Sequence, residues 1–203
     1  ESQKRFGIKC AGWGGSVCVP LIEDGGGCHH ISDIGICQHA AARLKFDHCH
    51  SWGGTHCLGD NEHTLCNTIT NKMACNHAEQ EIGKKCLGWG GEYCLDPEFA
   101  KCGDLKVKVL CKESWERFGL HCAGWGGSSC LALDDHPSKI TVEWMCQHSK
   151  RLLGIVSAGW SGKKCLARGE ATCGDIVTAG ICGASTSMHL DCLGWGGEAC
   201  LDR

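Results

Sequence analysis

The sequence repeats one short frame six times, and this repetition constrains its fold more than any other feature. Each copy holds a tryptophan and its glycines between two positions eight residues apart, as in CAGWGGSVC from Cys10 and CLGWGGEAC from Cys192. The six tryptophans, spaced by 35 to 39 residues, are Trp13, Trp52, Trp89, Trp125, Trp160 and Trp195. A period of this length is typical of one supersecondary unit that stacks on its neighbours.

In the complete repeats, two further cysteines follow the frame and make up a four-cysteine repeat. We call the pair around the tryptophan a and b, and the following pair, nine residues apart, c and d. The complete c and d pairs are Cys28 and Cys37, Cys66 and Cys75, Cys102 and Cys111, and Cys173 and Cys182. Pro137 replaces c in the fourth repeat, and Ser157 replaces a in the fifth. Losing both partners of one bridge would leave no stray thiol.

The cysteines predict disulfides rather than a zinc site. Twenty cysteines in 203 residues is the density of a disulfide scaffold, and the count is even. Twelve histidines make zinc the main alternative, but no C-x2-C knuckle occurs and no two cysteines lie closer than eight positions. Disulfides imply an oxidising compartment, so we expect a secreted protein. The opening ESQKRFGIKC has no signal-peptide pattern and is typical of a mature N-terminus.

The local patterns predict a small α+β repeat protein. Each frame, as in KKCLGWGGEYCLD, has two short arms around a glycine-rich turn and predicts a β-hairpin. After c, Asp104 as N-cap and Gly119 beyond the C-terminus would frame one helix, and Ser138 to Gly154 has the same pattern. The segments LKVKVL and KITVEW alternate enough to be strands instead. We expect one helix and one hairpin in each repeat of about 36 residues.

Longer-range similarity predicts two lobes. The stretch ESQKRFGIKCAGWGGSVC from Glu1 matches ESWERFGLHCAGWGGSSC from Glu113, and the third repeat matches the sixth. This pattern indicates triplication followed by duplication. We therefore expect a three-repeat lobe over residues 1–104 and a second over 105–203, related by pseudo-twofold symmetry.

Two disulfide patterns remain open on the sequence. One joins c to the next a, and b to d, and it explains the paired loss at Pro137 and Ser157. A 14-residue helix between c and a would span about 21 Å, however, whereas bridged Cα atoms lie within about 7 Å. The other pattern joins b to c and d to the next a, with Cys130–Cys146 as its exception. Both leave Cys10 to pair with Cys200 and tie the termini together.

Composition excludes several classes of protein. The formal net charge is −3 and the basic residues are dispersed, which argues against nucleic-acid binding. No apolar run approaches the roughly 20 residues of a membrane helix. The sequence lacks the P-loop, G-x-G-x-x-G, G-x-S-x-G and H-E-x-x-H patterns, so we expect no enzyme, no cofactor and no bound metal.

The candidate binding residues are the frame tryptophans and three histidines. The glycine-rich turn either packs the indole on a neighbouring repeat or presents it to a ligand, and presence in all six copies favours packing. His39, His77 and His148 each stand two residues after d, where the remaining repeats have Glu113 and Ala184. These histidines are either exposed helix residues or ligand contacts. Their spacing makes no convincing metal site.

With these features, the chain resembles the egg and gonad lectins of sea hares. The likeness lies in its length, its cysteine density and the C-x-G-W-G-G-x-x-C repeat that runs through the whole chain. The resemblance implies a secreted lectin that binds galactose and D-galacturonic acid and agglutinates cells. It supplies no contact residues, and Pro137, Ser157 and Ser161 depart from the pattern in repeats four and five.

Sugar chemistry is compatible with these residues. An indole can cover the apolar face of galactose, and a protonated histidine would suit the carboxylate of galacturonate. We therefore expect sites that combine a frame tryptophan with His39, His77 or His148. The alternative is a disulfide-rich structural or defence protein of an egg coat with no sugar site. Homodimerisation remains open, because two lobes in one chain would suffice for agglutination.

Overall fold

The computed structural model describes residues 4, 7, 9–21, 27–49, 51–60 and 64–203. The chain divides into two compact units, residues 1–100 and residues 101–203, and each is described by itself. The sequence predicted a division at residue 104 and a pseudo-twofold relation between the halves. That symmetry remains a prediction.

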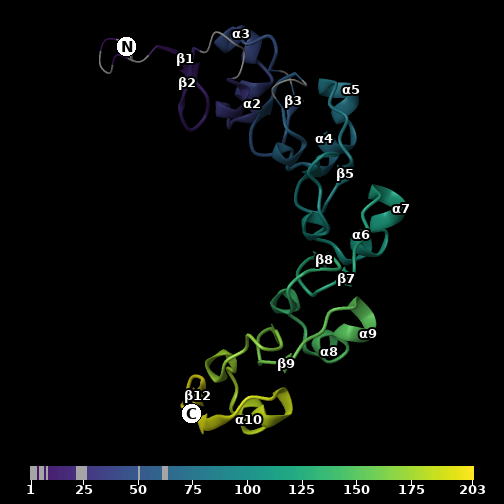
Figure 1. Cartoon of the computed structure of the whole chain (residues 1–203). Coiled ribbons are helices and arrows are strands. Elements are labelled where there is room, and N and C mark those ends of the chain that lie inside the picture. The colour runs from purple at the N-terminus through teal and green to yellow at the C-terminus, as the bar shows by residue number, and fades with distance from the viewer. Residues whose placement is uncertain (1–3, 5–6, 8, 22–26, 50, 61–63) are drawn as a thin grey trace. The chain divides into compact units, whose positions relative to one another are not determined.

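Among the described residues, six two-stranded antiparallel hairpins confirm the expectation for the tryptophan frame. They are β1 (Cys10–Trp13) with β2 (Cys18–Pro20), β3 (Ser51–Trp52) with β4 (Cys57–Leu58), β5 (Gly88–Trp89) with β6 (Cys94–Leu95), β7 (Gly124–Trp125) with β8 (Cys130–Leu131), β9 (Gly159–Trp160) with β10 (Cys165–Leu166), and β11 (Cys192–Trp195) with β12 (Cys200–Asp202). In every hairpin the tryptophan pairs across the ladder with cysteine b. Figure 1 shows these hairpins alternating with helices along the chain.

The turn explains why the frame ends in glycine. The last glycine of the frame has a φ between 102° and 119° in all six copies. A side chain is strained in this region, whereas glycine adopts it freely. The residue before this glycine donates its backbone N–H to the carbonyl of the residue before b. In the second hairpin, for example, Gly53 N–H donates to the carbonyl oxygen of His56 at 2.9 Å. The invariant glycine is therefore a requirement of the hairpin turn itself.

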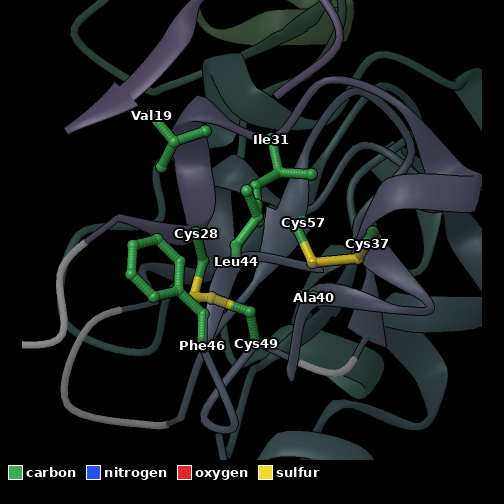
Figure 2. Close-up of a cluster of buried hydrophobic side chains, with 9 residues drawn as sticks. All are labelled: Val19, Cys28, Ile31, Cys37, Ala40, Leu44, Phe46, Cys49 and Cys57. Atoms are coloured by element: carbon green, nitrogen blue, oxygen red, sulfur yellow. A yellow bond between two sulfur atoms is a disulfide. The ribbon is translucent and has the colours of Figure 1, made fainter. Parts of the chain in front are cut away.

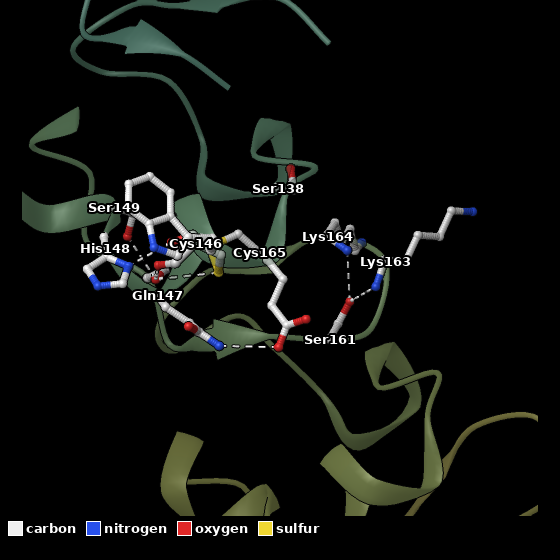
Figure 3. Close-up of a disulfide and its surroundings, with 12 residues drawn as sticks. Ser138, Cys146, Gln147, His148, Ser149, Ser161, Lys163, Lys164 and Cys165 are labelled. Atoms are coloured by element: carbon white, nitrogen blue, oxygen red, sulfur yellow. Dashed lines mark hydrogen bonds between the residues drawn. A yellow bond between two sulfur atoms is a disulfide. The ribbon is translucent and has the colours of Figure 1, made fainter. Parts of the chain in front are cut away.

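Ser161 replaces the middle glycine in the fifth copy without disturbing the turn. Its side chain is fully buried, and its hydroxyl accepts hydrogen bonds from the backbone N–H groups of Lys163 at 3.3 Å and Lys164 at 3.1 Å. Figure 3 shows both bonds. The departure from the pattern is therefore accommodated by new side-chain hydrogen bonds.

Between hairpins, the described residues form nine short α-helices and several 3-10 turns. The helices are α2 (Ile34–Cys37), α3 (Ala40–Leu44), α4 (Lys72–Asn76), α5 (Ala78–Ile82), α6 (Lys108–Lys112), α7 (Ser114–Phe118), α8 (Glu143–Gln147), α9 (Ser149–Leu153) and α10 (Ala179–Gly183). The 3-10 turns are η1 (Cys28–His30), η3 (Cys66–Thr68), η4 (Cys102–Asp104), η5 (Pro137–Lys139), η6 (Cys173–Asp175) and η7 (Ser185–Met188). A 3-10 turn therefore begins at or beside c, and a pair of short helices, or a helix and η7, follows.

The prediction of one long helix per repeat is wrong. Asp104 ends η4 instead of capping a helix, and Leu105 and Val107 beyond it are extended. The helix then breaks at Glu113, whose φ of −96° and ψ of 13° lie outside the helical region. Gly119 does end the second helix, in the left-handed conformation predicted for it. The break folds the chain back on itself, so c can reach the next a.

The disulfides follow one rule from one repeat to the next. Cysteine c joins the next a, as the first of the two patterns predicted, in Cys28–Cys49, Cys66–Cys86, Cys102–Cys122 and Cys173–Cys192. Cysteine d joins the next b, which neither pattern predicted, in Cys37–Cys57, Cys75–Cys94, Cys111–Cys130, Cys146–Cys165 and Cys182–Cys200. The helices of one repeat are thus bonded to the hairpin of the next.

The predicted closure between Cys10 and Cys200 is wrong. Cys10 pairs with Cys18 inside the first hairpin, and Cys200 pairs with Cys182. The reason lies in the rule itself. In this sequence no cysteine stands before Cys10, so a and b of the first hairpin pair with each other instead of with a c and a d one repeat before them.

Small buried clusters make up the core, and four of them lie at steps between consecutive hairpins. Figure 2 shows the first, which contains Val19, Ile31 and Phe46 together with the disulfides Cys28–Cys49 and Cys37–Cys57. The strand that begins at b contributes to two successive clusters. Neighbouring side chains of a strand point to opposite faces, so b packs in one cluster and the next residue in the other. Cys57 belongs to the first cluster and Leu58 to the second. Likewise Cys165 and Leu166 belong to consecutive clusters in the second unit.

A buried aliphatic residue three positions after c fixes each hairpin on its cluster. Ile31, Ile69, Leu105, Ile140 and Ile176 are all fully buried. Each of their carbonyl groups accepts a hydrogen bond of 2.9 to 3.0 Å from the backbone N–H of the next b. Backbone hydrogen bonds and disulfides therefore act on the same residue of the hairpin.

Candidate functional site

The six frame tryptophans fall into two groups by burial. Trp52, Trp89 and Trp160 are half-buried and pack against the clusters that precede them, and Trp125 is half-buried as well. The terminal Trp13 and Trp195 are 61% and 38% exposed. In the four middle frames, packing therefore covers much of the indole surface. A ligand could contact only the part of each indole that stays exposed.

Trp52, the tryptophan of the second frame, borders a cavity. The cavity has a volume of about 460 Å³ and lies in the first unit beside the hairpin β3–β4. Its lining residues are Gln38, Ser51, Trp52, Asn71, Met73, Ala74 and Glu81. We call it the Trp52 groove. It brings residues of α4 and α5, and Gln38 at the C-terminal end of α2, to the tryptophan of one hairpin.

Polar groups in the Trp52 groove are held in fixed positions. The Asn71 side-chain carbonyl accepts from the backbone N–H groups of Met73 at 2.9 Å and Ala74 at 3.1 Å, which caps α4. This leaves the Asn71 amide nitrogen as a donor. The Ser51 hydroxyl, at a position that is glycine in the other five frames, donates to the Glu81 carboxylate. The groove thus combines an indole with anchored amide and carboxylate groups.

The three predicted histidines lie at the helix breaks. Nδ1 of each is within 3.0 Å of a carbonyl oxygen four residues earlier, which is that of Gly35 for His39, Met73 for His77 and Trp144 for His148. Nδ1 must carry the proton to donate in this bond, so only Nε2 stays open to a ligand. None of the three lines the Trp52 groove, where the neighbouring Gln38 lies instead. Their role as sugar contacts remains a prediction.

Sequence reasoning missed Gln38, Asn71 and Glu81. Asn71 could have been found, because an asparagine before a helical segment is a common N-cap. Gln38 follows d directly, and only the direction of the helix decides whether it or His39 faces the tryptophan. Glu81 and Ser51 are 30 residues apart. No local pattern connects them.

One cluster in the described part of the chain has the spacing of a metal site. It comprises Cys28, His48 and Cys49, whose ligand atoms all lie within 4.8 Å of one another. The two sulfurs are joined in a disulfide, however, and metals bind the thiolate. All twenty cysteines are bonded, so the chain has no free thiol that could act as a nucleophile.

No helix in the ranges described is both long and apolar enough to cross a membrane. The chain matches no family model, no curated protein and no solved structure.

Proposed function

We propose that this chain is a secreted, multivalent lectin that binds galactose and galacturonic acid and agglutinates cells. The observation that supports the proposal is the Trp52 groove, where a half-exposed indole lies with Gln38, Asn71 and Glu81 around one cavity. Protein sites for small ligands combine an apolar surface with a few fixed polar groups in this way. Ten disulfides suit an oxidising compartment.

The chemistry of galactose suits the groove. The C–H groups on one face of the sugar pack against the indole, which gains apolar burial. Its hydroxyl groups donate to the Glu81 carboxylate and accept from the amides of Gln38 and Asn71. Glucose differs in the direction of one hydroxyl, so fixed partners such as these would distinguish the two sugars.

The repeats supply the second site that agglutination needs. Gln147 and Trp160 hold the same positions in the second unit as Gln38 and Trp52 hold in the first, one residue after d and in the next frame. We infer that the second unit carries a further sugar site at Trp160, which lacks the carboxylate because Met188 holds the position of Glu81. Two weak sites in one chain gain avidity on a cell surface without a dimer.

A calorimetric titration with galactose, galacturonic acid and glucose tests the proposal. We expect binding of both galacto sugars and none of glucose. Glu81→Gln should weaken galactose binding about tenfold, because the neutral amide loses a charge-assisted hydrogen bond. Glu79→Gln is the matched control, since Glu79 is exposed on the same helix and does not line the groove.

If no sugar produces heat, the proposal is wrong. The alternative is then a structural or defence protein of an egg coat, in which the tryptophan frames serve packing alone. The packing of Trp52, Trp89 and Trp160 against their clusters favours this alternative.

A further inference from the structure

A larger cavity, without tryptophan, lies in the second unit. It has a volume of about 570 Å³ and is bordered by η4, the turn of the hairpin β7–β8 and η5. Three lysines, Lys101, Lys106 and Lys139, and three aspartates, Asp104, Asp134 and Asp135, are among its lining residues. Ser128, Ser129 and Thr141 add hydroxyl groups. We call it the lysine groove.

The charges in the lysine groove are only partly paired. Lys139 forms an ion pair with Asp135, which also accepts from the backbone N–H of Ala132 at 2.8 Å. No carboxylate among the described residues lies within ion-pair distance of the ammonium group of Lys101 or Lys106. Two positive charges at one cavity are thus without an ion-pair partner among the described residues.

The same positions one repeat later are paired within the protein. His136, which corresponds to Lys101, lies 3.1 Å from Glu170, which corresponds to Asp135. Lys164, at the position of Ser129, lies 3.4 Å from Asp175. In that repeat the basic side chains are used internally. In the lysine groove the corresponding carboxylate, Asp135, is taken by Lys139, and Lys101 is left over.

The corresponding cavity in the first unit has a different character. It has a volume of about 160 Å³, and its lining includes His29, His56, Leu58 and Leu65 but no lysine. The larger volume and the lysines therefore distinguish the lysine groove from this cavity.

We propose that the lysine groove binds a saccharide that carries a carboxylate, at a site separate from the Trp52 groove. The ammonium groups of Lys101 and Lys106 donate charge-assisted hydrogen bonds to the sugar carboxylate. Asp134 accepts from ring hydroxyls, and the Ser128 hydroxyl can donate or accept. The volume is within the range of pockets that hold small ligands.

The two grooves divide neutral and acidic sugars between them. The Trp52 groove contains Glu81 and no cationic side chain, so it disfavours a second carboxylate. The lysine groove has the opposite preference. This inference rests on the proposed carbohydrate-binding function and adds to it the site at which acidic sugars bind.

The test is a calorimetric titration of the double variant Lys101→Met/Lys106→Met with galacturonic acid, glucuronic acid and galactose. We expect galacturonic acid affinity to fall at least about tenfold while galactose affinity stays within about twofold of the parent. The control is Lys150→Met/Lys163→Met, which removes the same charge at two exposed lysines outside the groove and should change neither. Thermal unfolding of each variant confirms that it is folded.

Three results would overturn the proposal. Unchanged galacturonic acid affinity in the double variant means that the lysine groove is not its site, while galactose binding keeps the lectin proposal intact. Competition between galactose and galacturonic acid for one site, with both weakened by Glu81→Gln, means that a single groove binds both. A parent chain that binds no sugar removes both proposals. Binding of glucuronic acid at the same lysines would support a site that selects for the carboxylate.

Discussion

The hydroxyl of Ser157 lies 3.1 Å from the hydroxyl of Ser149, where other repeats have a disulfide from cysteine a. Ser157 also donates to the carbonyl of Cys146 at 3.4 Å. These hydrogen bonds stand in for the bridge that would join it to position 137, where Pro137 begins η5. Figure 3 shows the surviving bridge of this repeat, Cys146–Cys165, with Ser149 beside it.

Restoring both lost cysteines should create an eleventh disulfide. The positions in Pro137→Cys/Ser157→Cys are 20 residues apart, and the four corresponding bridges close separations of 19 to 21 residues. We expect no titratable thiol after oxidative refolding and a gain in unfolding free energy of about 3 kcal/mol. Ser157→Cys alone should leave one thiol and gain nothing. Two free thiols in the double variant would mean that the fourth repeat has moved away from the common geometry.

Gly127→Ala should destabilise the second unit. Gly127 has a φ of +119°, and a Cβ atom there would lie 2.5 Å from Oγ1 of Thr141 and 2.8 Å from Cγ2 of Val142. We expect a loss of about 1–3 kcal/mol in unfolding free energy, measured by denaturant titration. Gly180→Ala is the control, because this glycine lies in α10 with nothing within 4 Å of its Cβ position. The control should gain up to about 1 kcal/mol. Equal stability of the two variants would contradict this account of the turn.

His56 should make stability depend on pH. Burial, and then the charge of His29, lower the pKa of His56 below its ordinary value. The unfolded chain then binds more protons than the folded chain as the pH falls. The stabilisation is therefore full above about pH 6.5 and is lost as the pH falls through the lowered pKa. We expect unfolding free energy to fall less in His56→Gln than in the parent between about pH 7.5 and about pH 5. Identical slopes would show that His56 contributes nothing.

None of His39, His77 and His148 lines the Trp52 groove, so replacing all three by alanine should lower stability and leave galactose affinity at that groove unchanged. Each ring loses its hydrogen bond to a carbonyl at the helix break, at about 0.5–1.5 kcal/mol for each bond. Thermal unfolding and a galactose titration of the same triple variant separate the two effects. A folded triple variant that no longer binds galactose would return the histidines to the sugar site.

The repeat itself made much of the fold predictable. Six hairpins follow from the spacing of tryptophan, glycine and cysteine, and Gly119 and Gly154 end their helices as predicted. The helix break did not follow from the sequence. His148 and Glu113 hold the same position but have different chemistry, and nothing in either residue forces a non-helical ψ. Tertiary packing decides it, because the reversal brings a c cysteine to an a cysteine.

The candidate site was predictable only in its tryptophan. Gln38 borders Trp52 and His39 does not. The two residues are consecutive, so only the direction in which α2 ends determines which of them faces the tryptophan. The pair formed by Ser51 and Glu81 depends on how the hairpin β3–β4 meets α5, which follows η3 and α4 along the chain. The lysine groove depends on which carboxylate each lysine finds. Charge counts along the sequence do not carry that information.

The rule that joins c and d to the next hairpin has a consequence for how the chain oxidises. The bridges form six separate blocks, such as Cys28 to Cys57 and Cys66 to Cys94, and no bridge crosses from one block to another. Four cysteines can pair in only three ways, so each complete block poses a small choice. During synthesis a block can close as soon as its own cysteines have emerged, without waiting for a distant partner. Conversely, no disulfide joins residues 1–57 to residues 66–203. One proteolytic cut within residues 58–65 would therefore leave two fragments with no covalent bond between them, even without a reductant.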